Sequence, residues 1–158
     1  MGQPSRSLRR WLSLSKVRLA ELSVKPKSLG DDEMYIGIVA GESSGDQLGL
    51  EVMQALRQRW PDARFVGIGG AQMRAAGIEC LYDMSEISFV GLEGLARHVF
   101  RILSIRKNLT RHFLRDPPDL FIGIDVPDFN LSLEKVLKVA GIKIIHYVAP
   151  TVWAWRSY

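Results

Sequence analysis

Short apolar runs alternate with amphipathic segments along residues 34–158, and this alternation is compatible with few folds. The apolar runs have the length of strands buried on both faces of a sheet. They lie at 35–40, 63–68, 119–124 and 142–148, with a brief extended stretch at 78–82. The amphipathic segments have helical spacing and lie at 48–60, 71–73, 95–113 and 131–140. Strands separated by helices predict βαβ units, so we expect an α/β fold with a doubly wound parallel sheet.

The positive charge is concentrated in the first 33 residues. Seven of the 21 basic side chains lie there with only four of the 17 acids, and the rest is nearly balanced. The net charge of +4 is therefore a poor argument for nucleic-acid binding, and no nucleic acid is expected as a partner. We predict that residues 1–33 form a disordered, basic, Ser- and Arg-rich extension. The alternatives are an organelle-targeting peptide, a basic membrane-surface helix, or a true start at Met34.

Cysteine and histidine usage restricts the chemistry. Cys80 is the only cysteine, which excludes an intrachain disulfide and favours a reducing compartment. The three histidines and Cys80 lack the spacing of metal ligands, so no metal site is expected. No cofactor is expected either. No apolar run approaches the roughly 20 residues of a membrane-spanning helix.

A Gly- and Ser-rich segment follows the first predicted strand, at the edge where doubly wound sheets bind their ligands. This segment, residues 41–46 (GESSGD), leads into a helix, where free backbone amides suit an anion or sugar oxygens. Its spacing matches neither the Walker loop nor the dinucleotide-binding G-x-G-x-x-G pattern. The alternative is that Ser43, Ser44 or Asp46 only caps that helix. The glycines of residues 67–70 (GIGG) indicate close packing rather than chemistry.

Residues 123–130 (GIDVPDFN) place a carboxylate at the end of another predicted strand. Asp125 follows an apolar run, and a carboxylate beside apolar neighbours can have a raised pKa and act as a general base. The alternative for Asp125 is a contact that stabilises the turn. Asp128 or Asn130 is expected to cap the following helix.

Two further segments have functional interpretations. Residues 146–156 contain two Trp and one Arg that suit a sugar-binding wall, or that pack on a following helix. His146 itself is expected to be a core histidine with its hydrogen bonds satisfied. Residues 88–92 (SFVGL) precede a basic amphipathic helix, which suits contact with an anionic membrane or an acyl chain. An ordinary surface helix with a solvated face is the alternative.

Taken together, in this order and spacing, the segments 41–46, 67–73, 123–130 and 146–156 resemble lipid-A-disaccharide synthases. The resemblance covers about residue 34 to the last residue. It implies a Rossmann-like N-terminal half of a glycosyltransferase-B fold. The implied reaction joins UDP-2,3-diacylglucosamine to 2,3-diacylglucosamine 1-phosphate with inversion and releases UDP. The implied location is cytoplasmic and peripheral, on the cytoplasmic face of the inner membrane.

The resemblance assigns roles to individual residues. It implies that Asp125 is the general base for the acceptor hydroxyl. Substrate-binding residues are expected at Glu42, Ser43, Ser44, Gly45, Asp128, Asn130, Trp153 and Arg156. Contact with membrane or acyl chains is expected at Phe89, Val90, Leu92, Arg97 and Arg101.

The family's proteins are more than twice as long as this chain, and their C-terminal domain carries most contacts to the UDP donor. We therefore expect residues 34–158 to form an incomplete, acceptor-side domain. The C-terminal half would be absent or on a separate chain, and the isolated chain would be inactive. Two other hypotheses remain: a non-catalytic lipid- or acceptor-binding module, and a generic nucleotide-binding Rossmann protein.

Overall fold

A computed structural model describes residues 33–88 and 95–147. The predicted contacts at Phe89, Val90, Leu92, Trp153 and Arg156 lie outside these residues, as does nearly all of the N-terminal extension. The elements are β1 (Tyr35–Ala40), α2 (Ser43–Arg57), β2 (Arg64–Gly69), α3 (Ala71–Ala75), β3 (Glu79–Asp83), the 3-10 turn η1 (Met84–Glu86), α4 (Leu95–Arg115), β4 (Leu120–Ile124), α5 (Pro127–Val139) and β5 (Lys143–Tyr147).

The five strands of the described chain form one parallel sheet in the order β3-β2-β1-β4-β5. The strand order reverses at β1, which pairs with β2 on one side and with β4 on the other. The doubly wound α/β fold expected from the sequence is therefore confirmed. In such sheets the crevice at the reversal, outside the carboxyl ends of the strands, is the usual place for a ligand.

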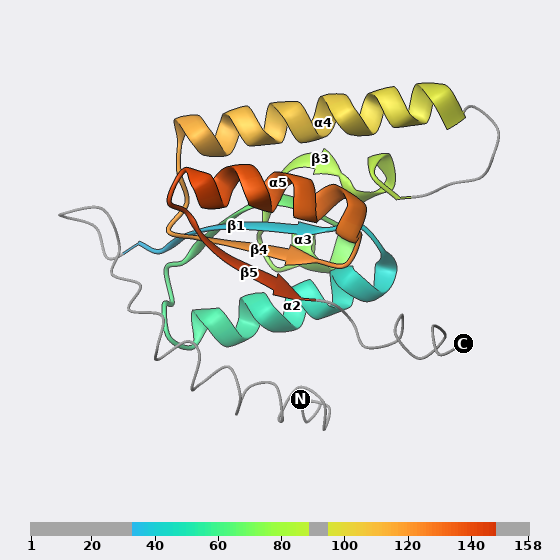
Figure 1. The fold of residues 1–158 in the computed structure, drawn as a ribbon. Helices are drawn as coiled ribbons and strands as arrows, with labels where there is room; N and C mark the ends of the chain where they lie inside the picture. The colour runs from blue at the N-terminus through green and yellow to red at the C-terminus, as the bar shows by residue number, and fades with distance from the viewer. Residues whose placement is uncertain (1–32, 89–94, 148–158) are drawn as a thin grey trace, which may run out of the picture.

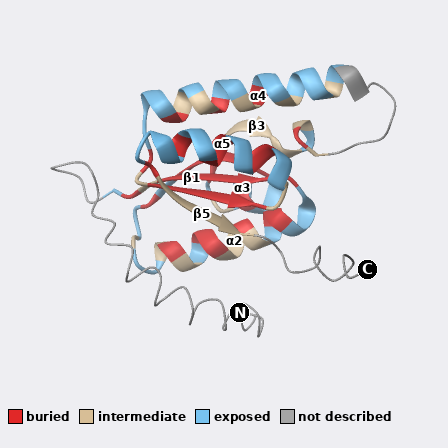
Figure 2. Ribbon diagram, in the orientation of Figure 1, coloured by how far each residue is buried: buried red, intermediate tan, exposed pale blue. Residues whose placement is uncertain are grey.

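Helices cover both faces of the sheet (Figure 1). Helices α2 and α3 pack on one face through Val52, Met53, Leu56 and Met73. Helices α4 and α5 pack on the other, where the apolar core includes Ile105, Leu109, Phe113, Phe129, Leu133 and Leu137. Figure 2 shows the central strands buried and most of the surface of α4 exposed. This burial on two faces explains why the strands read as continuous apolar runs.

Two helices begin earlier than their apolar spacing predicts. Helix α2 includes Ser43 and Ser44 in its first turn, and α5 begins at Pro127, because proline is favoured at the first helical position. The residues at the N-cap positions are Glu42 and Val126, and neither makes a capping side-chain hydrogen bond. The predictions that Ser43, Ser44 or Asp46 caps α2, and that Asp128 or Asn130 caps α5, are therefore wrong.

Gly67 pairs with Ile38 of β1 and faces its backbone at close range. Its φ is 153°, and a Cβ on this residue would overlap the carbonyl oxygen of Ile38. The pairing of β2 with β3 also shifts register between Gly67 and Ile68. The sheet therefore requires glycine at this position.

We expect Gly67→Ala to lower the free energy of unfolding by well over 2 kcal/mol, because it combines an unfavourable φ with a backbone clash. The matched control is Gly141→Ala, at a φ of 86° with nothing within 4 Å of the added Cβ. Its cost is the left-handed conformation alone, about 1–2 kcal/mol. Urea denaturation followed by circular dichroism measures both losses. Equal losses would show that the clash with Ile38 contributes nothing.

Candidate functional site

The candidate site is formed by the two loops that leave β1 and β4 at the reversal of the sheet. Ala40 pairs with Ile124 at the carboxyl ends of these strands. The chain then continues from β1 into α2 on one face and from β4 into α5 on the other (Figure 1). The two loops therefore start side by side and lead to opposite faces of the sheet. A contact between them is needed to fix one loop relative to the other.

Asp125 makes that connection through its carboxylate. Oδ1 accepts a hydrogen bond from the amide of Gly41 at 2.8 Å, and Oδ2 accepts one from the amide of Glu42 at 3.1 Å. A Cβ on Gly45 would overlap the same carboxylate, so glycine in the first turn of α2 makes room for it. The local turn-stabilising contact considered for Asp125 is therefore not the one found, because its carboxylate joins its own loop to the loop that follows β1.

The backbone at Asp125 is held in an unusual conformation. Asp125 and Val126 have φ values of 54° and 31°, in the region that non-glycine residues rarely adopt. Asn130 fixes this turn from helix α5. Its Nδ2 donates to the carbonyl oxygens of Ile124 at 3.2 Å and Asp125 at 3.1 Å. The position of the carboxylate is therefore determined by the backbone as well as by its own hydrogen bonds.

Burial raises the pKa of Asp125 to about 6. The hydrogen bonds from the amides of Gly41 and Glu42 oppose the rise, and the negative charge of Glu42 adds to it. The expectation of a raised pKa from the sequence is confirmed in direction. A carboxylate with this pKa is mostly ionised at neutral pH and is a stronger base than a solvated aspartate, which suits general-base catalysis.

Asp46 connects helices α2 and α3. It is 4% exposed, and its carboxylate accepts hydrogen bonds from the amides of Gly70 at 2.8 Å, Gln72 at 2.9 Å and Met73 at 3.1 Å. It therefore satisfies the free amides at the start of α3, which lacks a capping side chain of its own. A Cβ on Gly70 would lie 2.5 Å from Oδ2 of Asp46, which agrees with the packing role predicted for residues 67–70.

His146 is paired with a buried carboxylate beside the site. Its Nδ1 lies 2.8 Å from Oε1 of Glu134, and Glu134 is 6% exposed. Gly123, on the neighbouring strand β4, pairs in register with His146, and a Cβ on it would overlap this same carboxylate. The predicted hydrogen-bond partner is present, but His146 is half-buried rather than a core residue, and no pattern in the sequence indicated that the partner is acidic.

The other predicted binding residues occupy different environments. Glu42, Ser43 and Ser44 are exposed at the start of α2, beside the Asp125 carboxylate, and Asp128 is exposed in the first turn of α5. Asn130 is fully buried, and its Oδ1 has no hydrogen-bond partner among the described residues. Within residues 33–88 and 95–147, no three His, Cys, Asp or Glu side chains are placed to hold a metal ion.

We expect Asp125 to make the protein less stable at neutral pH than at mildly acidic pH, relative to a variant without this carboxyl. The folded-state pKa, about 6, exceeds the usual unfolded value of about 3.9, so the folded state binds the proton more tightly. The resulting stabilisation is fully present below pH 4 and is lost as the pH rises through 6. Urea unfolding of the wild type and Asp125→Asn between pH 4 and 7 measures the difference. Asp62→Asn, an exposed position, is the control, and a difference that is constant with pH would contradict the raised pKa.

We expect Asp46→Ala to lower the free energy of unfolding by roughly 2–4 kcal/mol, because it leaves buried amides of α3 without an acceptor. Asp46→Asn should cost less, since its one oxygen can still accept from Gly70 and Met73 as Oδ1 does. Urea denaturation gives the order of the three proteins. Equal stability of Asp46→Ala and the wild type would show that water satisfies these amides.

Comparison with known proteins agrees with this geometry. The family model described as lipid-A-disaccharide synthetase matches residues 36–158. The lipid-A-disaccharide synthase of Pseudoalteromonas translucida (strain TAC 125) is 56% identical over 125 residues, which are 79% of this chain and 32% of the relative. The enzyme of the same name from Francisella tularensis subsp. tularensis (strain WY96-3418) is 54% identical, over 79% of this chain and 33% of the relative. The chain thus spans about a third of the length of these curated relatives. With the family model matching more than half of its residues, this chain belongs to the lipid-A-disaccharide synthase family.

Proposed function

We propose that this chain forms the acceptor side of a lipid-A-disaccharide synthase, with Asp125 as the general base. The observation that carries the proposal is the carboxylate at the reversal of the sheet, with a pKa of about 6. Family membership supports the reaction class. The substrates proposed from the resemblance are UDP-2,3-diacylglucosamine and 2,3-diacylglucosamine 1-phosphate.

The proposed chemistry is a single displacement. The acceptor hydroxyl attacks the anomeric carbon of the donor as its proton passes to the Asp125 carboxylate. The new glycosidic C–O bond forms while the bond to UDP breaks, and UDP leaves with the electron pair. A fixed base lowers the barrier because it is already positioned and needs no reorganisation at the moment of proton transfer.

Residues around Asp125 are proposed to orient the acceptor. Glu42, Ser43 and Ser44 present exposed polar groups beside the carboxylate. Gly45 lets the Asp125 carboxylate lie close to the first turn of α2. Trp153 and Arg156 remain predicted sugar contacts. The charge that stabilises departing UDP is proposed to come from the part of such proteins that this chain does not span.

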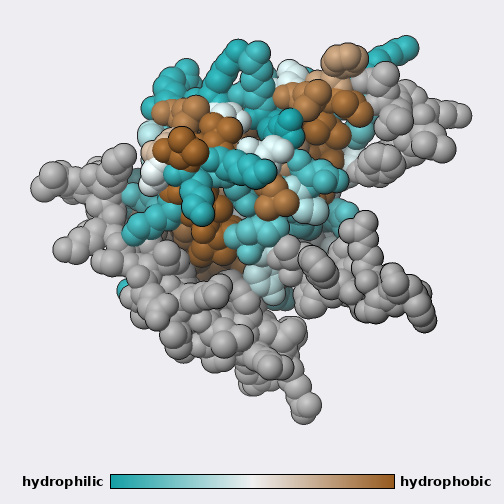
Figure 3. All heavy atoms as spheres, viewed as in Figure 1, coloured by the Kyte–Doolittle hydropathy of each residue, from teal (hydrophilic) through white to brown (hydrophobic). Residues whose placement is uncertain are grey.

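Helix α4 is proposed to contact a membrane surface or the acyl chains of the substrates. Hydrophobic side chains are exposed among hydrophilic ones along this helix (Figure 3). Phe100 is 73% exposed, and Val99 and Leu103 are each 43% exposed. Arg97 is exposed nearby, whereas Arg101 is paired with Glu86, with 2.9 Å between its Nε and Oε2 of that residue. The contact that we propose is peripheral. Among the helices described, none is long and apolar enough to cross a bilayer.

We expect Asp125→Asn to reduce turnover by about 10²–10⁴-fold in a full-length relative that carries residues 34–158 of this chain. An amide cannot accept the proton, and its NH₂ group would also face one of the amides of Gly41 and Glu42. That mismatch should cost about 1–3 kcal/mol of stability, so activity is measured well below the melting temperature. The control is Asp62→Asn.

The pH dependence separates the base from a merely structural carboxylate. The full-length relative that carries the unchanged residues 34–158 should lose kcat/KM below about pH 6, because Asp125 becomes protonated. The residual activity of Asp125→Asn should lack this acid limb. An unchanged pH profile in the variant would assign the proton transfer to another group.

A further inference from the structure

A groove lies between the C-terminal half of α4 and the edge strand β3, away from the loops that hold Asp125. Its volume is about 490 Å³. It is lined by Leu81, Tyr82, Asn108, Leu109, Arg111, His112 and Arg115. Strand β3 forms the edge of the sheet in the described chain, so side chains of α4 form the second wall of the groove.

The lining divides into an apolar part and a cationic part. Leu81 and Tyr82 are half-buried and supply the apolar surface, whereas Leu109 lies in α4 and is fully buried below it. Arg111 and Arg115 follow one another at helical i, i+4 spacing, with Asn108 one turn before Arg111. No acidic side chain is among the lining residues described. The groove therefore suits a ligand that is anionic at one end and apolar at the other.

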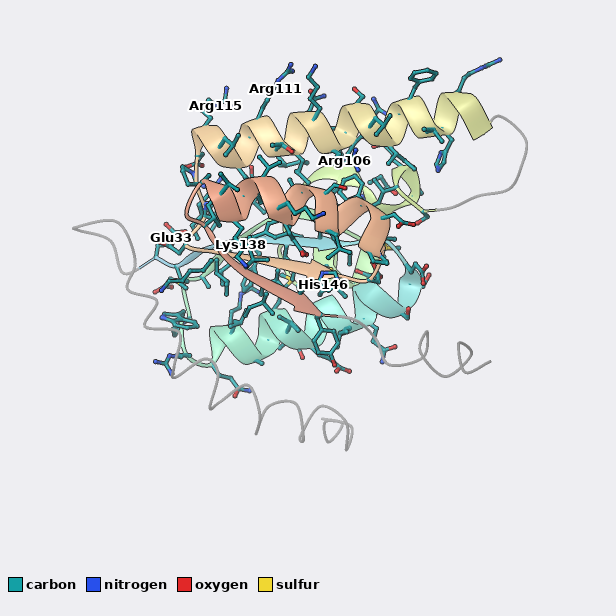
Figure 4. The ribbon with its side chains drawn as sticks, in the orientation of Figure 1. Glu33, Arg106, Arg111, Arg115, Lys138 and His146 are labelled. Carbon is teal, nitrogen blue, oxygen red and sulfur yellow. The ribbon has the colours of Figure 1, made fainter. Side chains whose placement is uncertain are left out.

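The two arginines are not neutralised by the protein. Within the described part of the chain, the arginines that form ion pairs are Arg64, Arg74 and Arg101, and none of these lines the groove. Arg111 donates only to Oδ1 of Asn108, at 3.4 Å. Figure 4 shows Arg111 and Arg115 projecting from α4 away from the sheet, whereas Arg106 lies nearer α5, where its Nη1 donates to the carbonyl of Asp128 at 3.4 Å.

We propose that this groove binds the phosphate group of an anionic glycerophospholipid. The planar guanidinium groups of Arg111 and Arg115 would bind the phosphate oxygens at the outer rim of the groove, since arginine has matching donor geometry. The start of the acyl chains would pack on Leu81 and Tyr82. This deepens the membrane contact proposed above, because the exposed Phe100, Leu103 and Leu114 belong to the same helix. Free phosphate compounds share the headgroup chemistry, and the test separates them.

The first experiment measures binding of a soluble short-chain lipid. Dihexanoyl phosphatidylglycerol, below its critical micelle concentration, is titrated into the protein and followed by NMR. We expect saturable shifts at Asn108 and His112, and at least tenfold weaker binding for Arg111→Gln/Arg115→Gln. The control Lys135→Gln/Lys138→Gln removes the same charge from exposed positions of α5 and should bind within twofold of the wild type. Equal loss in both variants would overturn the proposal in favour of non-specific attraction.

Inorganic phosphate and glycerol 3-phosphate, titrated in the same way, test the source of the phosphate. The proposal expects them to bind at least tenfold more weakly than the lipid, because they leave the apolar wall unused. Affinity equal to that of the lipid would overturn a lipid site and assign the groove to soluble phosphates. Melting temperatures of all variants, measured alongside, show that each is folded.

Vesicle sedimentation separates the groove from the membrane contact. Phe100→Ser/Leu103→Ser should weaken binding to phosphatidylcholine vesicles while leaving the short-chain lipid titration unchanged. If this variant binds vesicles as the wild type does, the proposed membrane contact of α4 fails and the groove stands. If the wild type shows no saturable shifts with the short-chain lipid, the groove proposal fails whatever the vesicles show.

Discussion

The arrangement of the site depends on one interaction, in which the carboxylate of Asp125 accepts hydrogen bonds from the amides of Gly41 and Glu42. Strands β1 and β4 are neighbours, but the helices that follow them cover opposite faces of the sheet. Beyond the ladder between the strands, the loops also meet where the side chain of Val126 packs on Gly41. Gly45, which leaves room for the carboxylate, and Asn130, which holds its backbone, both serve the contact of Asp125.

The surroundings of Asp125 act on its pKa in two opposite directions. The amide hydrogen bonds favour the ionised carboxylate, whereas burial favours the protonated acid. Burial has the larger effect, so the pKa rises to about 6 rather than falling. A base with this pKa is useful near neutral pH, because it is mostly ionised there and still binds a proton more tightly than a solvated aspartate does. The same geometry means that a substitution at Asp125 changes stability and chemistry together.

The sequence predicted the parallel α/β fold, the position of Asp125 at the end of its strand, and the direction of its pKa shift. These follow from local patterns, namely apolar runs, helical spacing and a charged residue beside apolar ones. It did not predict the partners of Asp125, Asp46 or His146, which are 83 or 84, 24 to 27, and 12 residues away along the chain. Short-range spacing carries no information on such pairings. Capping is a local rule and places Asp46 at the start of its own helix, α2, whereas its carboxylate accepts hydrogen bonds from the amides at the start of α3.

The crossover from β3 to β4 connects the site with the outer surface of α4. Its start is fixed at the site, because the hydroxyl of Ser88 donates to the carbonyls of Gly41 and, at 3.0 Å, of Met84. Its end carries Arg111 and Arg115 past the edge of the sheet. Gly41 thus contacts both Asp125 and this crossover. In the proposal above, a phospholipid bound beside α4 would hold the outer face of this helix at a membrane, and the same crossover contacts the Gly41 loop through Ser88.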